Sequence, residues 1–599
     1  MKQFWLIVSV VLGLYGFFME EAQAAEKREP LKVLYVGQSP SVPLKKYALV
    51  AAGAMAEERY AEDIRTRMPE FKNLLETFFE KVECVDADAY TPELSALYDV
   101  TIFDALPPSQ LSSAKVKRYL PETYDCPTVF IGHTAPMMGE SLGLKMDWYC
   151  MCLKEHALQI KRSHPVFKGP FVTDITLVER PTPTMVYNYA NGNEIPLSIP
   201  MWAVQKEPVK GYRIGMVSHG DAFEDSPDAE VISGGECLKS IDAVAIARHG
   251  NFLMWGFAAS PSYMTAEAQR VFANAICYIN RFKGKRPIAR KMEKGVTVRE
   301  RIQDNLDILE KGAYEAYCKR MRTSGREPLM REGFIKQFLH KDLYTRFGHD
   351  EMACREFLKE NMNYFYGNNY SFVVDKEVKS LGVANNDKRL LDKCIRMLET
   401  GRDTAKARSI LARYTVCNFA TPEAWREWFE RYRSKLFFTE SGGYKFMVND
   451  ETVVQPVLPR ESSKPKVTME PTRDSPVLFS ASLQNQLSGK GEIVLNGCIL
   501  DGFHIYASAN GNCPFYITKV EIDLPEGYKK VGTLAASPSR PMEGEEAIQV
   551  YEQKVVFKQK YEGHSFQMNP VAHCKVTYQC CDNQICMPPV TDEFEIPLQ

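Results

Sequence analysis

The sequence predicts a multidomain protein that joins an α/β region, an all-α region and an all-β region in that order. Three patterns predict this order. Short apolar runs alternate with helical spacing over residues 30–285, helical spacing alone continues over 290–435, and short strands divided by turn residues fill 475–599. The length of 599 residues agrees with this division, because it fits about three to five domains.

The composition is that of an ordinary globular protein, with 45% hydrophobic and 25% charged residues. It excludes a disordered, collagen-like or polytopic membrane protein. There are 74 Lys and Arg and 76 Asp and Glu, so the formal net charge is −2 and nothing marks the chain as a nucleic-acid binder. The 16 cysteines are too sparse for a small disulfide scaffold, but they matter if the chain enters an oxidising compartment.

Residues 1–24 predict a signal peptide. Lys2 precedes an apolar run over 3–19, and Ala22-Gln23-Ala24 fits the rule for cleavage between small residues. An uncleaved membrane anchor is the alternative, although a run of about 17 residues is short for a span. Cleavage would leave a mature periplasmic chain with no membrane span, in a compartment where disulfides persist.

The α/β region, 30–285, predicts a parallel sheet covered by helices on both faces. Short apolar strands are expected at 31–36, 82–85, 100–103, 128–131 and 252–255. Helical spacing before residue 82 and over 266–282 supplies the covering helices. The segment 165–216 is richer in Pro, Thr and Val and predicts additional antiparallel strands.

The middle region, 290–435, predicts helices. Thr421-Pro422 is an N-cap followed by proline at the first helical position. The aromatic stripe that follows is most simply core, with a docking surface as the alternative; it consists of Trp425, Trp428, Phe429 and Tyr432. Prolines recur through 450–474, which predicts a semi-extended linker before a β-sandwich over 475–599.

Four cysteines crowd the end of the chain: Cys574, Cys580, Cys581 and Cys586. Side chains of a strand over 573–581 alternate between two faces. The alternation puts Cys580 on the apolar face and Cys581 on the polar face, so we expect a buried Cys580 and an accessible Cys581.

The residues after this strand predict a hairpin. Asp582-Asn583 has the composition of a turn, and Ile585-Cys586-Met587 can return as the partner strand before Pro588-Pro589. A disulfide between Cys581 and Cys586 would close that hairpin.

Two segments of this region, Gly502-Phe503-His504-Ile505-Tyr506 and the run from Tyr578 to Pro589, resemble the N-terminal periplasmic domain of the thiol:disulfide interchange protein DsbD. The resemblance covers residues 475–599. It implies an immunoglobulin-like fold and a cysteine pair, here Cys581 and Cys586, that cycles between dithiol and disulfide. The implied partners are periplasmic thioredoxin-fold or other thiol proteins, and no cofactor is implied.

The sequence departs from that family in several places. It contains no Cys-x-x-Cys motif, Cys580 stands where the family usually has a small residue, and the acidic segment 542–546 lacks the aromatic residue of the family's shielding loop. The alternatives to redox exchange are a static disulfide that staples the hairpin, or free thiols. A short disulfide loop gains little entropic stabilisation, which favours exchange over a staple.

The α/β region resembles the ThuA-like group, which has the class I glutamine-amidotransferase-like fold and is linked by name to trehalose utilisation. The resemblance rests on Val129-Phe130-Ile131-Gly132-His133, on His164-Pro165-Val166-Phe167 and on Asn251-Phe252-Leu253-Met254-Trp255-Gly256. True amidotransferases carry a nucleophilic cysteine on a sharp elbow after a strand. The elbow here, Gly132-His133-Thr134, has none, so we expect no amidotransferase-type triad.

The polar candidates left in this region are His133, His164, His219, Asp221, Glu224, Asp225, Asp228 and His249. The acidic loop over residues 218–228 could bind a cation or sugar hydroxyls, and the alternative is a solvated, turn-rich loop. No metal-ligand spacing predicts a metal site. Cys150-x-Cys152 is too short for a zinc knuckle, and we expect it to be half-buried.

Three functions remain open from the sequence. The first is a periplasmic thiol–disulfide exchange protein that works through Cys581 and Cys586. The second is a ThuA-like enzyme or binding protein with a carbohydrate as its partner, in which the sandwich is an accessory module. The third is a non-catalytic scaffold with a static disulfide.

Overall fold

The computed structural model describes residues 27–41, 57–106, 120–121, 123–183, 196–206, 215–237, 240–291, 299–323, 327–366, 372–450, 470–473, 475–487, 490–509, 513, 515–542, 545–563, 570–582 and 585–598. The predicted signal peptide, 1–24, and most of the predicted linker, 450–474, lie outside these residues. Within the described parts, no helix combines the length and the apolar character needed to cross a bilayer.

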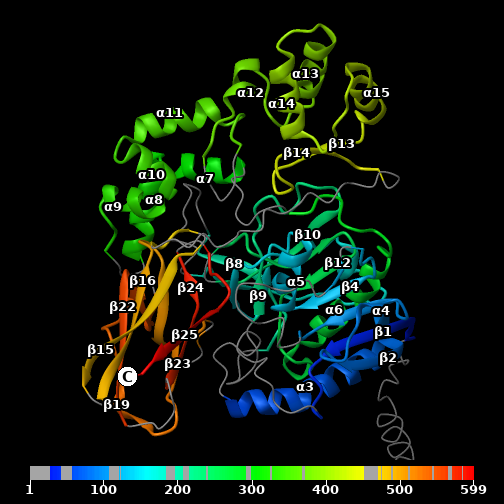
Figure 1. Ribbon diagram of the computed structural model, residues 1–599. Helices are drawn as coiled ribbons and strands as arrows, with labels where there is room; N and C mark the ends of the chain where they lie inside the picture. The colour runs from blue at the N-terminus through cyan, green and yellow to red at the C-terminus, as the bar shows by residue number, and fades with distance from the viewer. Residues whose placement is uncertain are drawn as a thin grey trace, which may run out of the picture.

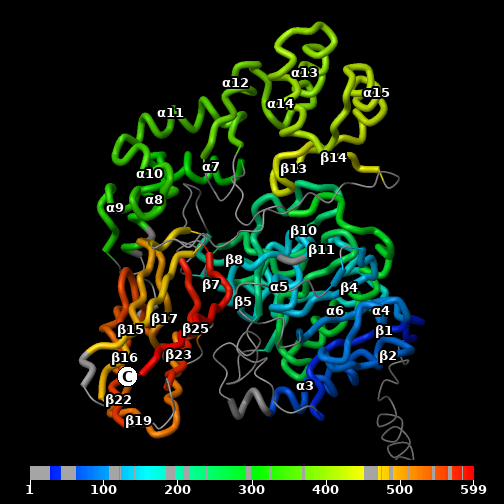
Figure 2. The backbone as a smooth tube through the Cα atoms, viewed as in Figure 1, coloured from blue at the N-terminus to red at the C-terminus, as the bar shows by residue number. Residues whose placement is uncertain are grey.

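The chain folds into three bodies that follow the predicted order. The α/β region and the C-terminal sheets lie side by side, and the helical region extends above both of them (Figure 1). The tube view follows the green and yellow helices from α9, above the C-terminal sheets, to α15, above the α/β region (Figure 2).

A ten-stranded sheet organises the α/β region, in the order β2-β1-β3-β4-β12-β11-β10-β6-β8-β7. Its first half is parallel, as predicted, and contains β1 (Glu29–Gly37), β2 (Phe79–Asp86), β3 (Val100–Phe103), β4 (Thr128–Ile131) and β12 (Phe252–Trp255). Its second half is antiparallel and contains β6 (His156–Leu158), β7 (Leu177–Pro181), β8 (Ser198–Ala203), β10 (Ala229–Gly235) and β11 (Val244–His249).

Helices cover both faces of the parallel half and enclose two cores. The helices are α3 (Glu57–Phe78), α4 (Pro92–Ser95), α5 (Thr134–Leu142) and α6 (Ala266–Asn280), with short 3-10 turns η2 (Pro165–Phe167) and η4 (Pro261–Tyr263). Phe71 of α3 and Ile276 of α6 pack in one core, and Met138 of α5 packs in the other. A separate pair of strands, β5 (Cys150–Leu153) and β9 (Gly215–Val217), aligns Cys150 with Val217.

The helical region contains α7 (Arg299–Ile308), α8 (Lys311–Thr323), α9 (Arg331–Phe338), α10 (Lys341–Phe347), α11 (Glu351–Asn361), α12 (Lys376–Leu381), α13 (Arg389–Glu399), α14 (Thr404–Tyr414) and α15 (Pro422–Tyr432). Thr421 caps α15 as predicted, since its side chain accepts a hydrogen bond from the amide of Ala424. Three residues of the predicted aromatic stripe are buried in one core: Trp425, Trp428 and Phe429. The region runs past the predicted boundary at 435 into a hairpin of β13 (Leu436–Thr439) and β14 (Lys445–Val448).

The C-terminal region consists of three antiparallel sheets, β15-β16-β22-β19, β20-β21-β17-β24 and β18-β23-β25. Their bounds are β15 (Val477–Leu487), β16 (Lys490–Ile499), β17 (His504–Ala509), β18 (Lys519–Asp523), β19 (Tyr528–Ala536), β20 (Arg540–Met542), β21 (Glu545–Glu552), β22 (Lys554–Gly563), β23 (Val571–Tyr578), β24 (Cys580–Cys581) and β25 (Val590–Pro597). The short apolar runs of 550–561 predict a single strand from the sequence, and that prediction is wrong. Gln553 has a φ of 56°, and at this residue the chain passes from β21 to β22 in another sheet.

Candidate thiol–disulfide site

A disulfide joins Cys581 and Cys586 across a tight turn that follows β24. Their Cα atoms lie 4.1 Å apart. The amide of Asp582 donates to the carbonyl oxygen of Ile585 at 2.9 Å, and the amide of Ile585 donates back to the Asp582 carboxylate at 2.7 Å. These reciprocal bonds fix the turn, because both amides at its base find acceptors within it.

The two adjacent cysteines of β24 face opposite sides of their sheet. Cys580 aligns with Ile505 of β17, and both pack in the core between the C-terminal sheets. Cys581 aligns with His504 and lies in a different core, which includes residues of the α/β region. The predicted alternation is therefore confirmed.

The predicted accessibility of Cys581 is wrong. Cys581 is 0% exposed and Cys586 is 1% exposed. The polar side chains that share a face with Cys581 over 573–581 predict a solvent-exposed face. The α/β region covers that face at Cys581. Apolar side chains of the C-terminal sheets form the rest of the cover, and they belong to Tyr506, Phe515, Ile548 and Val550.

One backbone hydrogen bond shows how closely the two regions meet. The amide of Cys586 donates to the carbonyl oxygen of Tyr149 at 2.9 Å. Tyr149 immediately precedes β5, so the hairpin disulfide lies against the start of that strand. Figure 1 shows β24 at the edge of the C-terminal sheets that faces the α/β region, next to β9, the partner strand of β5.

A second disulfide lies within β5. It joins Cys150 and Cys152, whose Cα atoms are 5.3 Å apart, and the side chains are 0% and 1% exposed. The expectation of a half-buried pair is therefore wrong. Residues i and i+2 of a strand share a face, so both sulfur atoms point to the core that also contains Cys581 and Cys586, while Met151 packs in the opposite core.

Polar groups approach the sulfur of Cys586 from β17. The Tyr506 hydroxyl lies 3.7 Å from Cys586 Sγ and 3.4 Å from Nε2 of His504. Phe515 stacks on the Tyr506 ring with centroids 4.3 Å apart, which holds the hydroxyl in place. A hydroxyl donor beside a sulfur stabilises the thiolate when a disulfide opens.

Among the predicted polar candidates, His219 contacts Tyr149, the residue whose carbonyl oxygen bonds to Cys586. Its ring packs on Tyr149 with centroids 4.2 Å apart, at the end of β9. Burial lowers the pKa of His219 to about 4, and the positive charge of Lys291 adds to this effect while Asp147 opposes it. The imidazole is therefore neutral at pH 7.

The acidic loop does not form a solvated turn or an open binding site. Asp221 pairs with Arg301 of α7, with 2.8 Å between its carboxylate and Nε. Asp225 accepts hydrogen bonds from the amide and hydroxyl of Ser441 at 2.8 and 2.9 Å and from the hydroxyl of Thr439 at 3.0 Å. The loop thus fastens the helical region to the α/β region.

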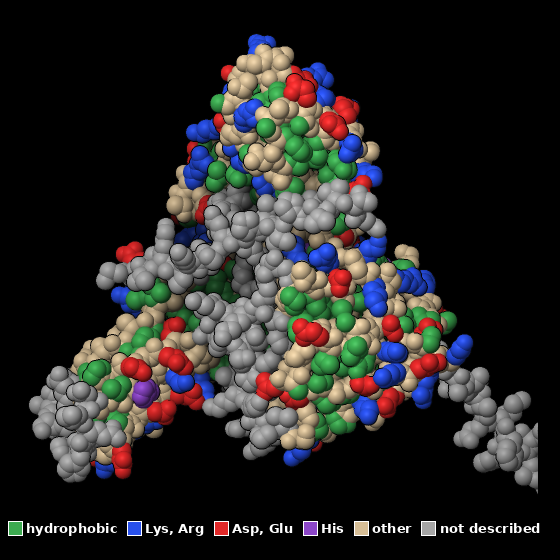
Figure 3. Space-filling view, turned by 45° about the vertical axis from the view of Figure 1, so that its right-hand side comes forward, with side chains coloured by type: hydrophobic (Ala, Val, Ile, Leu, Met, Phe, Trp, Pro, Cys, Tyr) green, Lys and Arg blue, Asp and Glu red, His purple; other side chains and the backbone are tan. Residues whose placement is uncertain are grey.

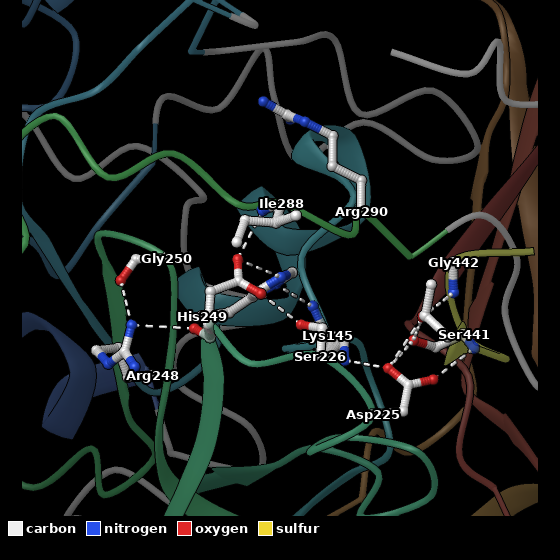
Figure 4. A network of polar contacts seen from close by, with 12 residues as sticks. Lys145, Asp225, Ser226, Arg248, His249, Gly250, Ile288, Arg290, Ser441 and Gly442 are labelled. Atoms are coloured by element: carbon white, nitrogen blue, oxygen red, sulfur yellow. Dashed lines mark hydrogen bonds and ion pairs between the residues drawn. The ribbon is translucent and has the colours of Figure 1, made fainter. Parts of the chain in front are cut away.

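Asp225 also neutralises a buried cation. Lys145 is 2% exposed and forms an ion pair with the Asp225 carboxylate. Figure 4 shows Lys145 and Ser441 approaching this carboxylate from opposite sides. His249 Nε2 lies 3.7 Å from the carboxylate of Asp228, which accepts a 2.6 Å hydrogen bond from the amide of Ile288. Asp225 and Asp228 therefore have a structural role, because each carboxylate joins segments that are far apart in the sequence.

The other candidates lie apart from the disulfides. Gly132 has a φ of +54° and His133 follows it at the start of α5, so the expected elbow is present as a backbone turn. His164 packs on Tyr278, and Glu224 forms a 2.5 Å ion pair with Lys161 at the surface. The structure does not gather these side chains into one site.

Sequence reasoning missed one cluster that could hold a metal ion. Side-chain ligand atoms of Glu155, His156 and Glu236 lie within 4.8 Å of one another. Glu155 and His156 are adjacent in the sequence, but Glu236 lies near them only because β10 pairs with β6. His156 Nδ1 is 2.9 Å from the Glu236 carboxylate, and Lys154 Nζ is 3.6 Å from it, so this carboxylate already has a hydrogen-bond partner and a cation beside it.

The surface carries both signs of charge. On the face drawn in Figure 3, Lys and Arg alternate with Asp and Glu over all three bodies. This distribution agrees with the near-zero formal net charge.

Comparisons with known proteins concern the C-terminal region. No curated protein matches the chain. Among solved structures, the reduced N-terminal domain of DsbD from Neisseria meningitidis is 20% identical, covering 20% of this chain and 84% of that one with a TM-score of 0.14. The N-terminal periplasmic domain of ScsB from Proteus mirabilis is 16% identical, covering 21% and 49% with a TM-score of 0.17.

A third structure is the complex between the DsbD and PilB N-terminal domains from Neisseria meningitidis, at 16% identity, covering 20% and 81% with a TM-score of 0.14. The ThuA-like resemblance predicted for residues 30–285 gains no support from these comparisons and stays a prediction. The family model described as thiol:disulfide interchange protein DsbD, N-terminal, matches residues 475–598, so this region carries the signature of that family.

Proposed function

We propose that this chain is a periplasmic thiol–disulfide exchange protein whose C-terminal region works through Cys581 and Cys586. The partner is a thioredoxin-fold or other thiol protein. The observation that carries the proposal is the disulfide between these two cysteines, which closes a hairpin inside the region that the DsbD family model matches.

The surroundings of the disulfide support exchange. Reduction needs one sulfur to leave as a thiolate, and the Tyr506 hydroxyl beside Cys586 Sγ is placed to stabilise that charge. In contrast, Cys574 is a free thiol buried in the sandwich core. Burial raises the pKa of Cys574 to about 11, which suits a structural thiol.

A carbohydrate partner is not proposed. The carboxylates expected to bind it, Asp221 and Asp225, already bond to groups of the helical region.

The proposal is tested by redox titration of the full chain. The protein is equilibrated in dithiothreitol buffers of graded potential, alkylated, and digested for mass spectrometry of the Cys581 and Cys586 peptides. We expect the midpoint potential of the pair to lie above about −300 mV, so that biological dithiols can reduce it. A pair that stays oxidised well below that potential would be a static staple and would refute the proposal.

A trapping variant tests the partner. Cys586→Ser leaves Cys581 able to form a mixed disulfide with a thioredoxin whose resolving cysteine is also replaced. The variant is made in a Cys498→Ser background, because Cys498 is an exposed free thiol and would form unrelated adducts. The matched control is Cys581→Ser/Cys586→Ser in the same background, which should form no adduct.

A further inference from the structure

We propose that Cys150 and Cys152 form a second redox pair, and that it exchanges electrons with Cys581 and Cys586 inside the same chain. This inference rests on the proposed function and adds to it a second site and its internal partner. Neither the family match nor the predicted α/β fold assigns any role to Cys150 and Cys152.

The first argument is distance. The amide of Cys586 bonds to the carbonyl oxygen of Tyr149, the residue before Cys150. Standard bond lengths then place the Cα atoms of Cys586 and Cys150 at most about 7 Å apart, counting the N–Cα bond, the hydrogen bond and one peptide unit. Disulfides join Cα atoms about 4.4–6.8 Å apart, so a mixed disulfide between these residues needs little movement of the backbone.

The second argument is orientation. Cys150 and Cys152 share one face of β5, and that face belongs to the apolar core that contains Cys581 and Cys586. The intervening Met151 points to the other core. The strand therefore presents both sulfur atoms to the core in which the C-terminal disulfide lies.

The third argument is access. All four cysteines are at most 1% exposed. In the closed arrangement a partner protein cannot reach either pair, whereas the two pairs share one water-poor core. Exchange between them is the thiol chemistry that this arrangement permits, and exchange with an outside protein requires the α/β region and the sheet of β17, β21 and β24 to separate.

The step is a two-electron transfer that begins when an external protein dithiol of the thioredoxin class has reduced Cys581 and Cys586. The Cys586 thiolate attacks Cys150, forming a Cys586–Cys150 bond, and Cys152 leaves as a thiolate that takes up a proton. Cys581, after losing its proton, attacks Cys586, re-forms the Cys581–Cys586 disulfide and releases Cys150 as a thiol. One dithiol is oxidised, one disulfide is reduced, and the protons balance.

Cross-linking tests the geometry. The full chain carrying Cys581→Ser and Cys152→Ser retains one cysteine of each pair, Cys586 and Cys150. We expect a Cys150–Cys586 disulfide in the peptide map after mild oxidation. Cys574 serves as the internal control because it is buried in the other core, so a Cys150–Cys574 peptide should be absent. Absence of the Cys150–Cys586 link in a folded protein would overturn the inference.

Kinetics tests the transfer. Reduced thioredoxin is the probe dithiol, and differential alkylation with mass spectrometry follows the thiols of Cys150 and Cys152. We expect Cys581→Ser/Cys586→Ser to slow the appearance of these thiols by at least about tenfold relative to the unchanged chain, since Cys150 and Cys152 then lose their internal electron donor. An equal rate in both proteins would overturn the inference and leave the proposed function standing.

A second double variant, in which the α/β pair is replaced, tests the transfer even if Cys581→Ser/Cys586→Ser does not fold. In Cys150→Ser/Cys152→Ser, the reduced Cys581–Cys586 pair has no internal acceptor, so it should stay reduced after a limiting pulse of thioredoxin. In the unchanged chain the same pair should re-oxidise as Cys150 and Cys152 gain thiols. If thioredoxin never reduces Cys581–Cys586 in either protein, the proposed function fails and the inference falls with it.

Discussion

The amide of Cys586 donates a 2.9 Å hydrogen bond to the carbonyl oxygen of Tyr149, which ties the C-terminal hairpin to the strand that carries Cys150. Residues far apart in the sequence thus build one buried sulfur-rich site. The α/β region covers the disulfide of the C-terminal region, and four predictions follow from the buried contacts of the molecule.

Tyr506→Phe should move the alkylation of the reduced pair to higher pH, because it removes the hydroxyl that lies 3.7 Å from Cys586 Sγ. The measurement is the rate of alkylation of the reduced pair as a function of pH. Tyr561→Phe is the matched control, since the Tyr561 hydroxyl is buried without a hydrogen-bond partner. An unchanged pH profile in Tyr506→Phe would show that the hydroxyl does not act on the sulfur.

Val550→Glu should make the reduced cysteines Cys581 and Cys586 react faster with a bulky maleimide. Val550 is buried between its sheet and the α/β region, and a carboxylate there favours separation of the two. Val531→Glu is the control, because Val531 is partly exposed on β19. Circular dichroism should show that both variants stay folded. Equal labelling rates in the two variants would contradict a cover formed by the α/β region.

Asp225→Asn should lower the free energy of unfolding by about 3–5 kcal/mol, because it leaves the buried Lys145 ammonium without its counter-charge. Glu224→Gln, one residue away, removes an exposed ion pair with Lys161 and should cost no more than about 1 kcal/mol. Urea denaturation of the two variants gives the comparison. Similar losses in both would show that Asp225 is not a buried junction.

Stability should fall on acidification through His219. Burial lowers the pKa of His219 to about 4 in the folded protein, below its usual value of about 6.5, so the unfolded chain binds more protons between these two pH values. The stability that the neutral His219 ring contributes to the folded protein is fully present above pH 6.5 and is lost as the pH falls toward 4. From pH 7 to pH 5 the loss should be about 2 kcal/mol.

Denaturation of His219→Gln at pH 7 and pH 5 checks this prediction. The variant should lose less stability than the unchanged chain over that interval. His573→Gln, at an exposed position of β23, should keep the full pH dependence. A slope in His219→Gln equal to that of the unchanged chain would refute the assignment.

Much of the local structure could be predicted from the sequence. The apolar runs at 100–103, 128–131 and 252–255 are strands as expected, because strands buried on both faces need continuous apolar side chains. The alternation around Cys580 and Cys581 was also readable, because a strand has a period of two. The sequence predicts one strand over 550–561 because apolar residues continue on both sides of Gln553 and no Gly-Asn type turn separates β21 from β22.

The sequence by itself determined the order of the three regions, the family signature of residues 475–598 and the cysteine pair within it, since all of these depend on residues near one another in the chain. Only the tertiary structure decided that Cys581 is buried, that the acidic loop is a junction and that Cys150 and Cys152 lie beside the C-terminal disulfide. Exposure depends on what packs against a face, and that partner can come from any distance along the chain. A strand pattern shows which side chains share a face, but it does not show what that face meets.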